Sequence, residues 1–271
     1  MPFVRVDDLV VHYDLTGPAD APVIVFGNSL GTSYDLWDDN VGALCDRYRV
    51  LRLDMRGHGL TSITPGTPRP TIDAVTQDVV ELLEALSIGR VRYVGLSIGG
   101  MIGQRLAATH PERLEALVLC ATGNQLSTPE IWNARIASVE AGGIEAIADG
   151  TMQRWFAPST HRDRADTIAG FRNMLVRTPQ PGYIDGCKTV RDADLRADDA
   201  RITTPTLIIS GAQDQAAPVE RGQTLHAAIA SSQFVVVDDA GHLLNVEQPD
   251  RVNRLLNAFL AEPTRAVEAA R

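Results

Sequence analysis

The sequence predicts an α/β fold, in which a mostly parallel sheet carries helices on both faces and one helical insertion. Two observations support this prediction. Short continuous apolar runs, which are typical of strands buried on both faces, alternate with helical patterns along most of the 271 residues. From about residue 122 to residue 192, by contrast, helical patterns continue without a convincing strand. We expect that segment to lie over the carboxyl ends of the parallel strands, where ligands bind in such sheets.

The first predicted elements form one edge of the sheet. Residues 4–13 alternate loosely in polarity before a glycine–proline turn, which predicts an antiparallel edge hairpin. Continuous apolar runs at 23–26 and 50–53 predict two buried strands. A helix containing Trp37 and Leu44 is expected between them.

The remaining elements complete a sheet of eight strands. A loop with Pro65, Pro68 and Pro70 precedes a strongly amphipathic helix at about 72–86. The other predicted strands lie at 91–94, 116–120, 206–210 and 234–237. A final helix is expected at about 249–260, and the small and charged residues 261–271 are expected to fray.

The predicted organisation is one core interrupted by an insertion. Residues 1–122 form the first part of the core, residues 123–192 a helical cap, and residues 193–271 the second part of the core. A chain of 271 residues is long enough to bury a large apolar core.

The composition argues against several classes of protein. A formal net charge of −9 without a basic cluster argues against a nucleic-acid partner. Cys45, Cys120 and Cys187 are widely separated, which argues against a zinc site or a disulfide framework and fits a reducing compartment. We find no signal-peptide pattern, and no apolar run approaches the roughly 18 residues of a membrane helix. We therefore expect a soluble, cytoplasmic protein with no membrane partner; the sequence allows a homo-oligomer.

The segment Gly95-Leu96-Ser97-Ile98-Gly99 joins a predicted strand to a predicted helix. A serine on so sharp a turn needs strained backbone angles, and side chains two residues away would collide with the neighbouring strand and helix. Gly95 and Gly99 remove those side chains, so we expect the Ser97 hydroxyl to stand clear of the sheet as a nucleophile. The alternative is an ordinary glycine-rich turn with a solvated serine.

A serine nucleophile needs an adjacent base, and in a sheet of this type an acid and then a histidine follow the serine along the chain. The histidines after Ser97 are His110, His161, His226 and His242. The first is expected to cap the helix after Ser97, the second lies in the insertion, and the third lies within a helix. His242 directly follows the last apolar strand, at its carboxyl end, and is therefore the predicted base.

Asp214 is the predicted acid of this constellation. It lies just past the strand at 206–210, on a loop beside the one that carries His242. Its role would be to hold the imidazole tautomer and to stabilise the imidazolium. Asp238 and Asp239 are nearer to His242 in sequence, but they share its strand and are expected to be solvated loop carboxylates.

An oxyanion hole requires two N–H donors. The N–H of Ile98, directly after the nucleophile, is one candidate, and the N–H of Leu30 in the small-residue loop 28–31 is the other. The alternative for that loop is a tight turn with an Asx cap. His58, in the loop 54–59, is expected to tie loops together beside the site rather than to act in the chemistry.

These residues together resemble the α/β-hydrolase fold family, over nearly the whole chain except its last residues. Within that family the chain resembles the 3-oxoadipate enol-lactonases, in the segments 28–32, 95–104, 129–136, 154–156, 191–196 and 242–249. Ile98 departs from the pattern, because methionine is commoner there. The segments in the insertion are the more diagnostic ones, since the cap usually sets the substrate.

The resemblance implies hydrolysis of 3-oxoadipate enol-lactone to 3-oxoadipate, a step in the breakdown of aromatic acids, through a serine acyl-enzyme without metal or organic cofactor. The substrate carries a carboxylate, for which the arginine fork is the best-suited partner. We therefore expect Arg135 to bind that carboxylate, with Trp132 and Trp155 beside the ring and Ser29 also contacting the substrate. The alternative is a solvated Arg135 on a cap whose core contains the tryptophans.

Other functions use the same residues. A general carboxylesterase or a carbon–carbon bond hydrolase would share the triad, and broad activity on neutral esters would favour the esterase. A ligand-binding receptor that retains the fold would show slow single turnover and tight ligand retention. The complete set of serine, histidine and aspartate argues against the receptor.

Overall fold

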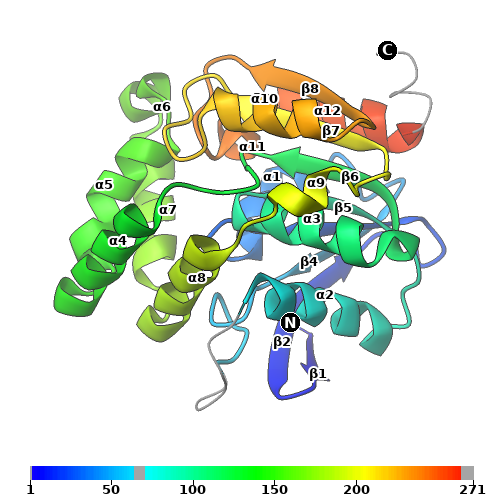
Figure 1. Cartoon of the computed structure of the whole chain (residues 1–271), viewed down its shortest axis with the longest axis horizontal. Coiled ribbons are helices and arrows are strands. Elements are labelled where there is room, and N and C mark those ends of the chain that lie inside the picture. The colour runs from blue at the N-terminus through cyan, green and yellow to red at the C-terminus, as the bar shows by residue number, and fades with distance from the viewer. Residues whose placement is uncertain (1, 64–70, 264–271) are drawn as a thin grey trace.

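The computed structural model describes residues 2–63 and 71–263, which include an eight-stranded sheet (Figure 1). The strands are β1 (Phe3–Val6), β2 (Leu9–Thr16), β3 (Val23–Gly27), β4 (Arg49–Leu53), β5 (Val91–Leu96), β6 (Leu114–Cys120), β7 (Thr206–Gly211) and β8 (Ser232–Val237). Their order across the sheet is β1-β2-β4-β3-β5-β6-β7-β8. β2 pairs antiparallel with β1 and β4, and all other neighbours are parallel, so the predicted fold class is confirmed.

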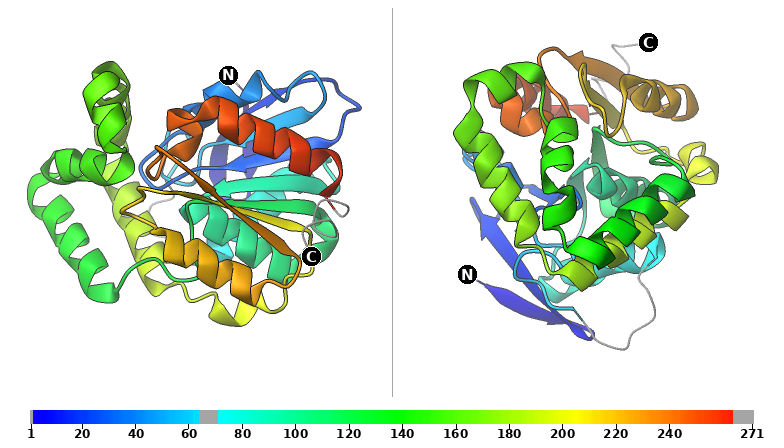
Figure 2. Two further views of the ribbon diagram at one scale, coloured as in Figure 1. Left: turned by 90° about the horizontal axis from the view of Figure 1, so that it is seen from above. Right: turned by 90° about the vertical axis from the view of Figure 1, so that its left-hand side faces the viewer.

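Helices cover both faces of this sheet, and a further group of helices follows β6 (Figure 1). In chain order the helices are η1 (Tyr34–Trp37), α1 (Asp38–Val41), α2 (Ile72–Ala85), α3 (Ile98–Thr109), η2 (Pro111–Arg113), α4 (Pro129–Gly142), α5 (Glu145–Trp155), α6 (Pro158–Asp163), α7 (Ala165–Val176), α8 (Gln180–Asp192), α9 (Arg196–Asp199), α10 (Val219–Ala228), α11 (Leu244–Glu247) and α12 (Pro249–Ala261). Helices α2, α3 and α10 cover one face, and α1 and α12 cover the other (Figure 2).

The continuous apolar runs are buried because helices pack on both sides of the strands. Ile24, Val25 and Phe26 in β3 have no exposed surface, and complete burial of such side chains stabilises by roughly 1.5–3 kcal/mol each. The helix expected around Trp37 and Leu44 is shorter than predicted. It consists of the 3₁₀ turn η1 and the single turn α1, and Leu44 is buried beyond its end.

Five helices, α4 to α8, follow β6 and precede α9 (Figure 1). No strand occurs within residues 122–192, as the sequence predicts. Two glycines bring this group against the core, since a Cβ on Gly182 of α8 would lie 2.1 Å from the Gly57 carbonyl oxygen. The proline-rich loop, with Pro65, Pro68 and Pro70, and the tail from residue 264 lie outside the described residues.

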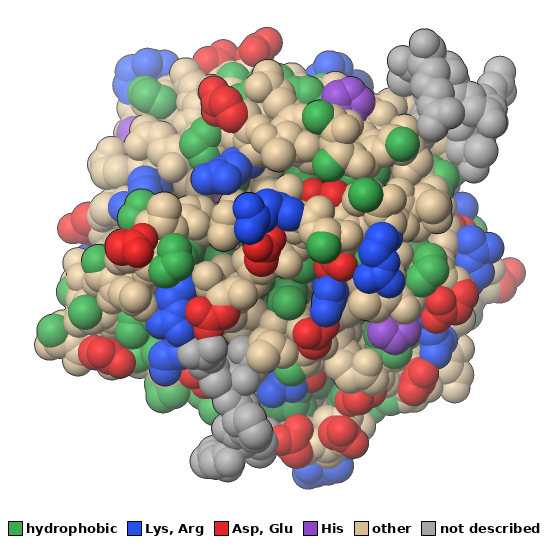
Figure 3. Space-filling view, in the orientation of Figure 1, with side chains coloured by type: hydrophobic (Ala, Val, Ile, Leu, Met, Phe, Trp, Pro, Cys, Tyr) green, Lys and Arg blue, Asp and Glu red, His purple; other side chains and the backbone are tan. Residues whose placement is uncertain are grey.

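The surface and the cysteines are unremarkable for a globular protein. On the face in Figure 3, basic and acidic side chains are interspersed. The cysteines are free thiols, with Cys45 half-buried and Cys120 and Cys187 buried. None of the helices within residues 2–63 and 71–263 has the length and apolar character that a bilayer span requires.

Candidate active site

Ser97 stands on a strained turn between β5 and α3. Its φ of 60° and ψ of −120° lie in a region that residues other than glycine rarely adopt. A Cβ on Gly95 would lie 2.2 Å from the Gly99 carbonyl oxygen, and a Cβ on Gly99 would lie 2.4 Å from that of Gly27. Both collisions that the sequence predicts are therefore present, one with the helix and one with the neighbouring strand. The Thr122 hydroxyl holds the turn by donating to the Ser97 carbonyl oxygen at 2.7 Å.

His242 and Asp214 meet at the carboxyl edge of the sheet. The His242 Nδ1 lies 2.9 Å from Asp214 Oδ2, and both side chains are buried. The other carboxylate oxygen accepts from the N–H groups of Ala216 and Ala217 at 2.7 and 2.8 Å. Because a carboxylate only accepts, Nδ1 carries the shared proton, and in the neutral ring Nε2 therefore presents a lone pair. This is the tautomer that a general base requires.

His242 Nε2 is within hydrogen-bond distance of the Ser29 hydroxyl. Ser29 Oγ lies 3.5 Å from His242 Nε2, and within the described residues no hydrogen bond joins Ser97 Oγ to His242. Ser97 is nevertheless next to the Ser29 loop, because Gly27 of β3 pairs with Gly95 of β5 and the Gly99 N–H donates to Asn28 at 3.1 Å. Nucleophile and base are often loosely paired without substrate.

Two backbone N–H groups, those of Leu30 and Ile98, are the predicted oxyanion donors. Neither the Ile98 N–H nor the Leu30 N–H donates to an acceptor in the part of the chain that the structure describes. The loop is not an Asx-capped turn, because the Asn28 amide donates to the Leu53 carbonyl at 2.7 Å and accepts from Trp37 Nε1 at 3.1 Å. The free N–H groups follow instead from the first position of α3 and from the turn at Gly31, whose φ is +80°.

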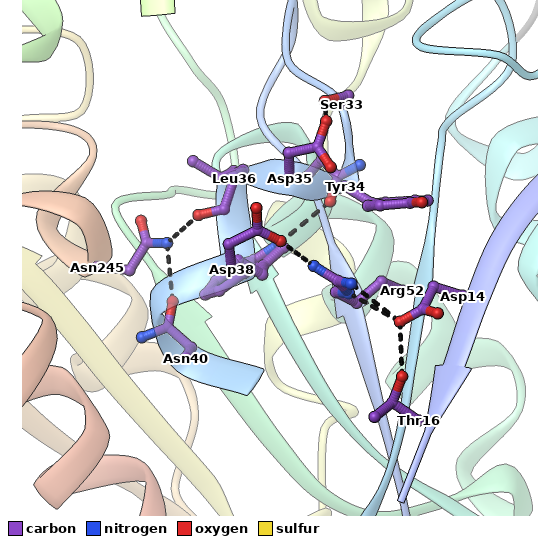
Figure 4. A network of polar contacts seen from close by, with 12 residues as sticks. Asp14, Thr16, Ser33, Tyr34, Asp35, Leu36, Asp38, Asn40, Arg52 and Asn245 are labelled. Carbon is purple, nitrogen blue, oxygen red and sulfur yellow. Dashed lines mark hydrogen bonds and ion pairs between the residues drawn. The ribbon is translucent and has the colours of Figure 1, made fainter. Parts of the chain in front are cut away.

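The segment after this loop, which contains η1 and α1, is held by ion pairs on one side and hydrogen bonds on the other (Figure 4). Arg52 of β4 binds Asp14 at 2.9 Å and also pairs with Asp38. On the other side the Asn245 amide donates to the Leu36 carbonyl at 2.8 Å and to Asn40 at 3.1 Å. Asn245 lies in α11, directly after the His242 loop, so the loops of Leu30 and His242 are held to one another.

Hydrogen bonds connect the His242 loop to the end of α5, to the loop after it and to α6. The carbonyl oxygen of Trp155, the last residue of α5, accepts from the His242 N–H at 2.8 Å. The buried Glu247 carboxylate accepts from the Gly241 N–H at 2.5 Å, the Ala157 N–H at 2.7 Å and the Thr160 hydroxyl at 2.6 Å. Burial raises the pKa of Glu247, and these hydrogen bonds act in the opposite direction.

Sequence reasoning missed Glu247 as a support of the site. Its only signal is its position five residues after His242. Its partners in α6 and the preceding loop lie 87 and 90 residues away in sequence, so no local pattern marks it.

The other histidines and aspartates lie apart from this pair. His110 contacts Thr109, His161 contacts the Met152 carbonyl, and His226 contacts Ser232. Asp238 and Asp239 are exposed, as expected.

His58 is buried and has a hydrogen bond within its own loop. It is fully buried, with Nδ1 3.1 Å from the Arg56 carbonyl oxygen. Burial lowers the pKa of His58 to about 4, which keeps the ring neutral.

Arg135 and Trp132 lie three residues apart on α4, where side chains at this spacing share one face. The Arg135 guanidinium carbon is 5.6 Å from the Trp132 ring centroid, and the guanidinium donates to the Tyr183 hydroxyl at 3.0 Å. Trp155 is 4% exposed and belongs to the hydrophobic core of the protein. Its burial matches the alternative expectation, in which that tryptophan is a core residue.

No metal centre accompanies these residues in the described part of the chain. Residues 2–63 and 71–263 contain no group of three or more His, Cys, Asp or Glu side chains that could hold a metal ion. The arrangement fits an acyl-transfer site, in which Ser97 is the candidate nucleophile, His242 the candidate base oriented by Asp214, and the Leu30 and Ile98 N–H groups the candidate oxyanion donors.

The chain is similar to proteins of known class. The family profile described as alpha/beta hydrolase fold matches residues 22–249. The chain is 35% identical over 253 residues to 3-oxoadipate enol-lactonase 2 of Acinetobacter baylyi, covering 93% of this chain and 94% of that one. It is 29% identical over 274 residues to a Stutzerimonas stutzeri protein named for carbamate hydrolysis, RutD, covering 96% and 100%. The crystal structure of the enol-lactonase from Burkholderia xenovorans LB400 superposes with a TM-score of 0.93 at 37% identity, covering 96% and 100%.

Proposed function

The chain belongs to the α/β-hydrolase fold family, and from that premise we propose that it is a serine hydrolase that opens 3-oxoadipate enol-lactone to 3-oxoadipate. The observation that carries the proposal is the buried His242–Asp214 pair beside the strained Ser97 turn. The similarity to enol-lactonases along the chain supports the choice of substrate. In this reading the protein serves the breakdown of aromatic acids in the cytoplasm.

The first half of the reaction forms an acyl-enzyme. The Ser97 hydroxyl attacks the lactone carbonyl carbon while His242 Nε2 takes its proton. Asp214, 2.9 Å from Nδ1, stabilises the imidazolium that results. The negative charge that develops on the carbonyl oxygen is stabilised by the N–H groups of Leu30 and Ile98.

The second half releases the product. When the tetrahedral intermediate collapses, the bond between the acyl carbon and the ring oxygen breaks, and the leaving enolate takes the proton held by the His242 imidazolium and becomes a ketone. The ring opens without losing a fragment, so the whole substrate remains attached to Ser97. Water, deprotonated by the again neutral His242, then attacks the ester, and His242 returns the proton to the Ser97 oxygen as the diacid leaves.

Binding of the substrate carboxylate is assigned to Arg135. The guanidinium is half-buried and stacks on Trp132, and the Tyr183 hydroxyl that it contacts belongs to a ring packed against Gly31 of the oxyanion loop. Ser29, 3.5 Å from His242 Nε2, would contact the substrate at the reacting centre. A carboxylate in this region gains a charge-assisted hydrogen bond that a neutral ester lacks.

The experiment that tests the proposal compares kcat/KM on the enol-lactone with kcat/KM on a neutral short-chain aryl ester. A preference of about 100-fold, about 2.7 kcal/mol of transition-state discrimination, would support the lactonase. Equal rates would leave a general carboxylesterase, and the same assay with a carbamate tests the activity for which RutD is named. Ser97→Ala should abolish turnover of every substrate while the protein stays folded.

A further inference from the structure

Two arginines converge on one hydroxyl of α5. Arg135 Nη2 and Arg154 Nη2 each lie 3.2 Å from Thr151 Oγ1 and donate to it. The Thr151 hydroxyl itself donates to the Ile147 carbonyl oxygen at 2.8 Å, so its hydrogen is already used. Both guanidinium groups therefore share a single neutral acceptor, although each offers further N–H donors.

These two cations lack a carboxylate partner. No Asp or Glu oxygen lies within 4.0 Å of either guanidinium among residues 2–63 and 71–263. The two carboxylates of α5 that form ion pairs, Glu145 and Asp149, bind Arg172 of α7 instead. Burial lowers the pKa of Arg154, and the neighbouring Arg135 lowers it further. Two half-buried like charges repel, and an anion between them would offset that cost.

Each arginine is connected through its neighbours to one part of the candidate active site. Arg135 donates to the Tyr183 hydroxyl, and a Cβ on Gly31 would lie 3.0 Å from the Tyr183 ring, so this path leads to the oxyanion loop. Arg154 immediately precedes Trp155, whose carbonyl oxygen accepts from the His242 N–H at 2.8 Å. An anion held by both arginines would thus be fixed relative to both the oxyanion loop and the base.

We propose that Arg154 forms, with Arg135, a two-arginine carboxylate site that selects lactones bearing a carboxylate side chain, an inference that rests on the proposed function. Each guanidinium holds one oxygen of the substrate carboxylate. Arg154 is therefore a specificity-determining residue, and a neutral ester gains nothing from it.

The test replaces one arginine at a time. Arg154→Gln should lower kcat/KM on the enol-lactone by roughly 10- to 100-fold, mainly through KM, because a hydrogen bond to a charged group is lost. Arg135→Gln should act in the same way, whereas both variants should keep kcat/KM on a neutral aryl ester within about 3-fold. Arg162→Gln, which removes an exposed charge from α6, is the matched control and should leave kcat/KM unchanged on both substrates.

Two results would overturn the inference. An Arg154→Gln variant with an unchanged KM for the lactone would show that Arg154 does not bind the substrate. Equal losses on the lactone and on the neutral ester would show that Arg154 only supports α5. Arg154→Lys, which keeps the charge without the fork, should fall between the wild type and Arg154→Gln.

A second readout separates this inference from the proposed function. Adipate, a straight-chain dicarboxylate, should inhibit hydrolysis of the neutral ester, and Arg154→Gln should weaken that inhibition roughly 10-fold or more. If adipate inhibits in this way but the protein shows no preference for the lactone, the proposed lactonase function is wrong and the carboxylate site is still supported. If the protein prefers the lactone but Arg154→Gln leaves adipate inhibition unchanged, the lactonase function is supported and the two-arginine carboxylate site is wrong.

Discussion

Replacing Gly99 by alanine should displace the turn that carries Ser97, with an effect that follows from the packing of β3 on α3. A Cβ at residue 99 would lie 2.4 Å from the oxygen and 2.5 Å from the carbon of the Gly27 carbonyl, whereas ordinary Cβ contacts begin at 3.4 Å. Both atoms belong to the backbone, so no side-chain rotation can relieve the overlap. The start of α3 must therefore move by about 1 Å.

This displacement should cost both stability and activity. Overpacking of this kind destabilises by about 1–3 kcal/mol, which urea unfolding measures. The moved residues include Ile98, whose N–H is a proposed oxyanion donor, and loss of one such donor lowers kcat by roughly 10²–10³-fold. Because the donor is shifted rather than removed, we expect kcat of Gly99→Ala to fall at least about 10-fold.

Gly170→Ala is the matched control for this substitution. Gly170 lies inside α7, and a Cβ there would meet nothing within 4 Å. Alanine should therefore stabilise the protein by about 0.5–1 kcal/mol through helix propensity and leave kcat unchanged. A Gly99→Ala variant with wild-type stability and wild-type kcat would refute the crowding argument.

Other predictions concern three buried ionisable groups. Burial lowers the pKa of His58 from 6.5 to about 4, so the stability it contributes is present above pH 6.5 and is lost as the pH falls toward 4. The loss is at most about 3 kcal/mol, and urea unfolding should show a weaker acid dependence in His58→Asn. Burial raises the pKa of Asp199 from 3.8 to about 6, so its contribution is present below pH 3.8 and is lost as the pH rises through 6. Asp199→Asn should remove that slope, and an unchanged slope would contradict the assignment. Glu247→Ala leaves the Gly241 and Ala157 N–H groups without an acceptor and should destabilise by about 2–5 kcal/mol in the same assay; a loss below about 0.5 kcal/mol would contradict its role.

The strands and the Ser97 turn are predictable because their signals are local. An apolar run such as 23–26 needs only its own residues to indicate a strand buried on both faces. Gly95 and Gly99 indicate the strained turn because both flank Ser97 between a strand pattern and a helix pattern, and the Gly95 collision is with Gly99 of the same turn.

Contacts between distant segments are not predictable in this way. Two hydrogen bonds join residues about 90 positions apart: the His242 N–H donates to the Trp155 carbonyl, and the Ala157 N–H donates to the Glu247 carboxylate. They depend on how the α4–α8 helices sit on the core, which apolar periodicity does not encode. The same holds for Arg154, whose importance appears only when α4 and α5 bring it beside Arg135.

The covalent step at Ser97 can be observed by mass spectrometry of enzyme quenched during its first turnover of the enol-lactone. We predict an adduct with the full mass of the substrate on the peptide that contains Ser97, because the ring opens without losing a fragment. The adduct should be absent from Ser97→Ala. Rapid turnover with no adduct at Ser97, or an adduct on another residue, would contradict the serine mechanism.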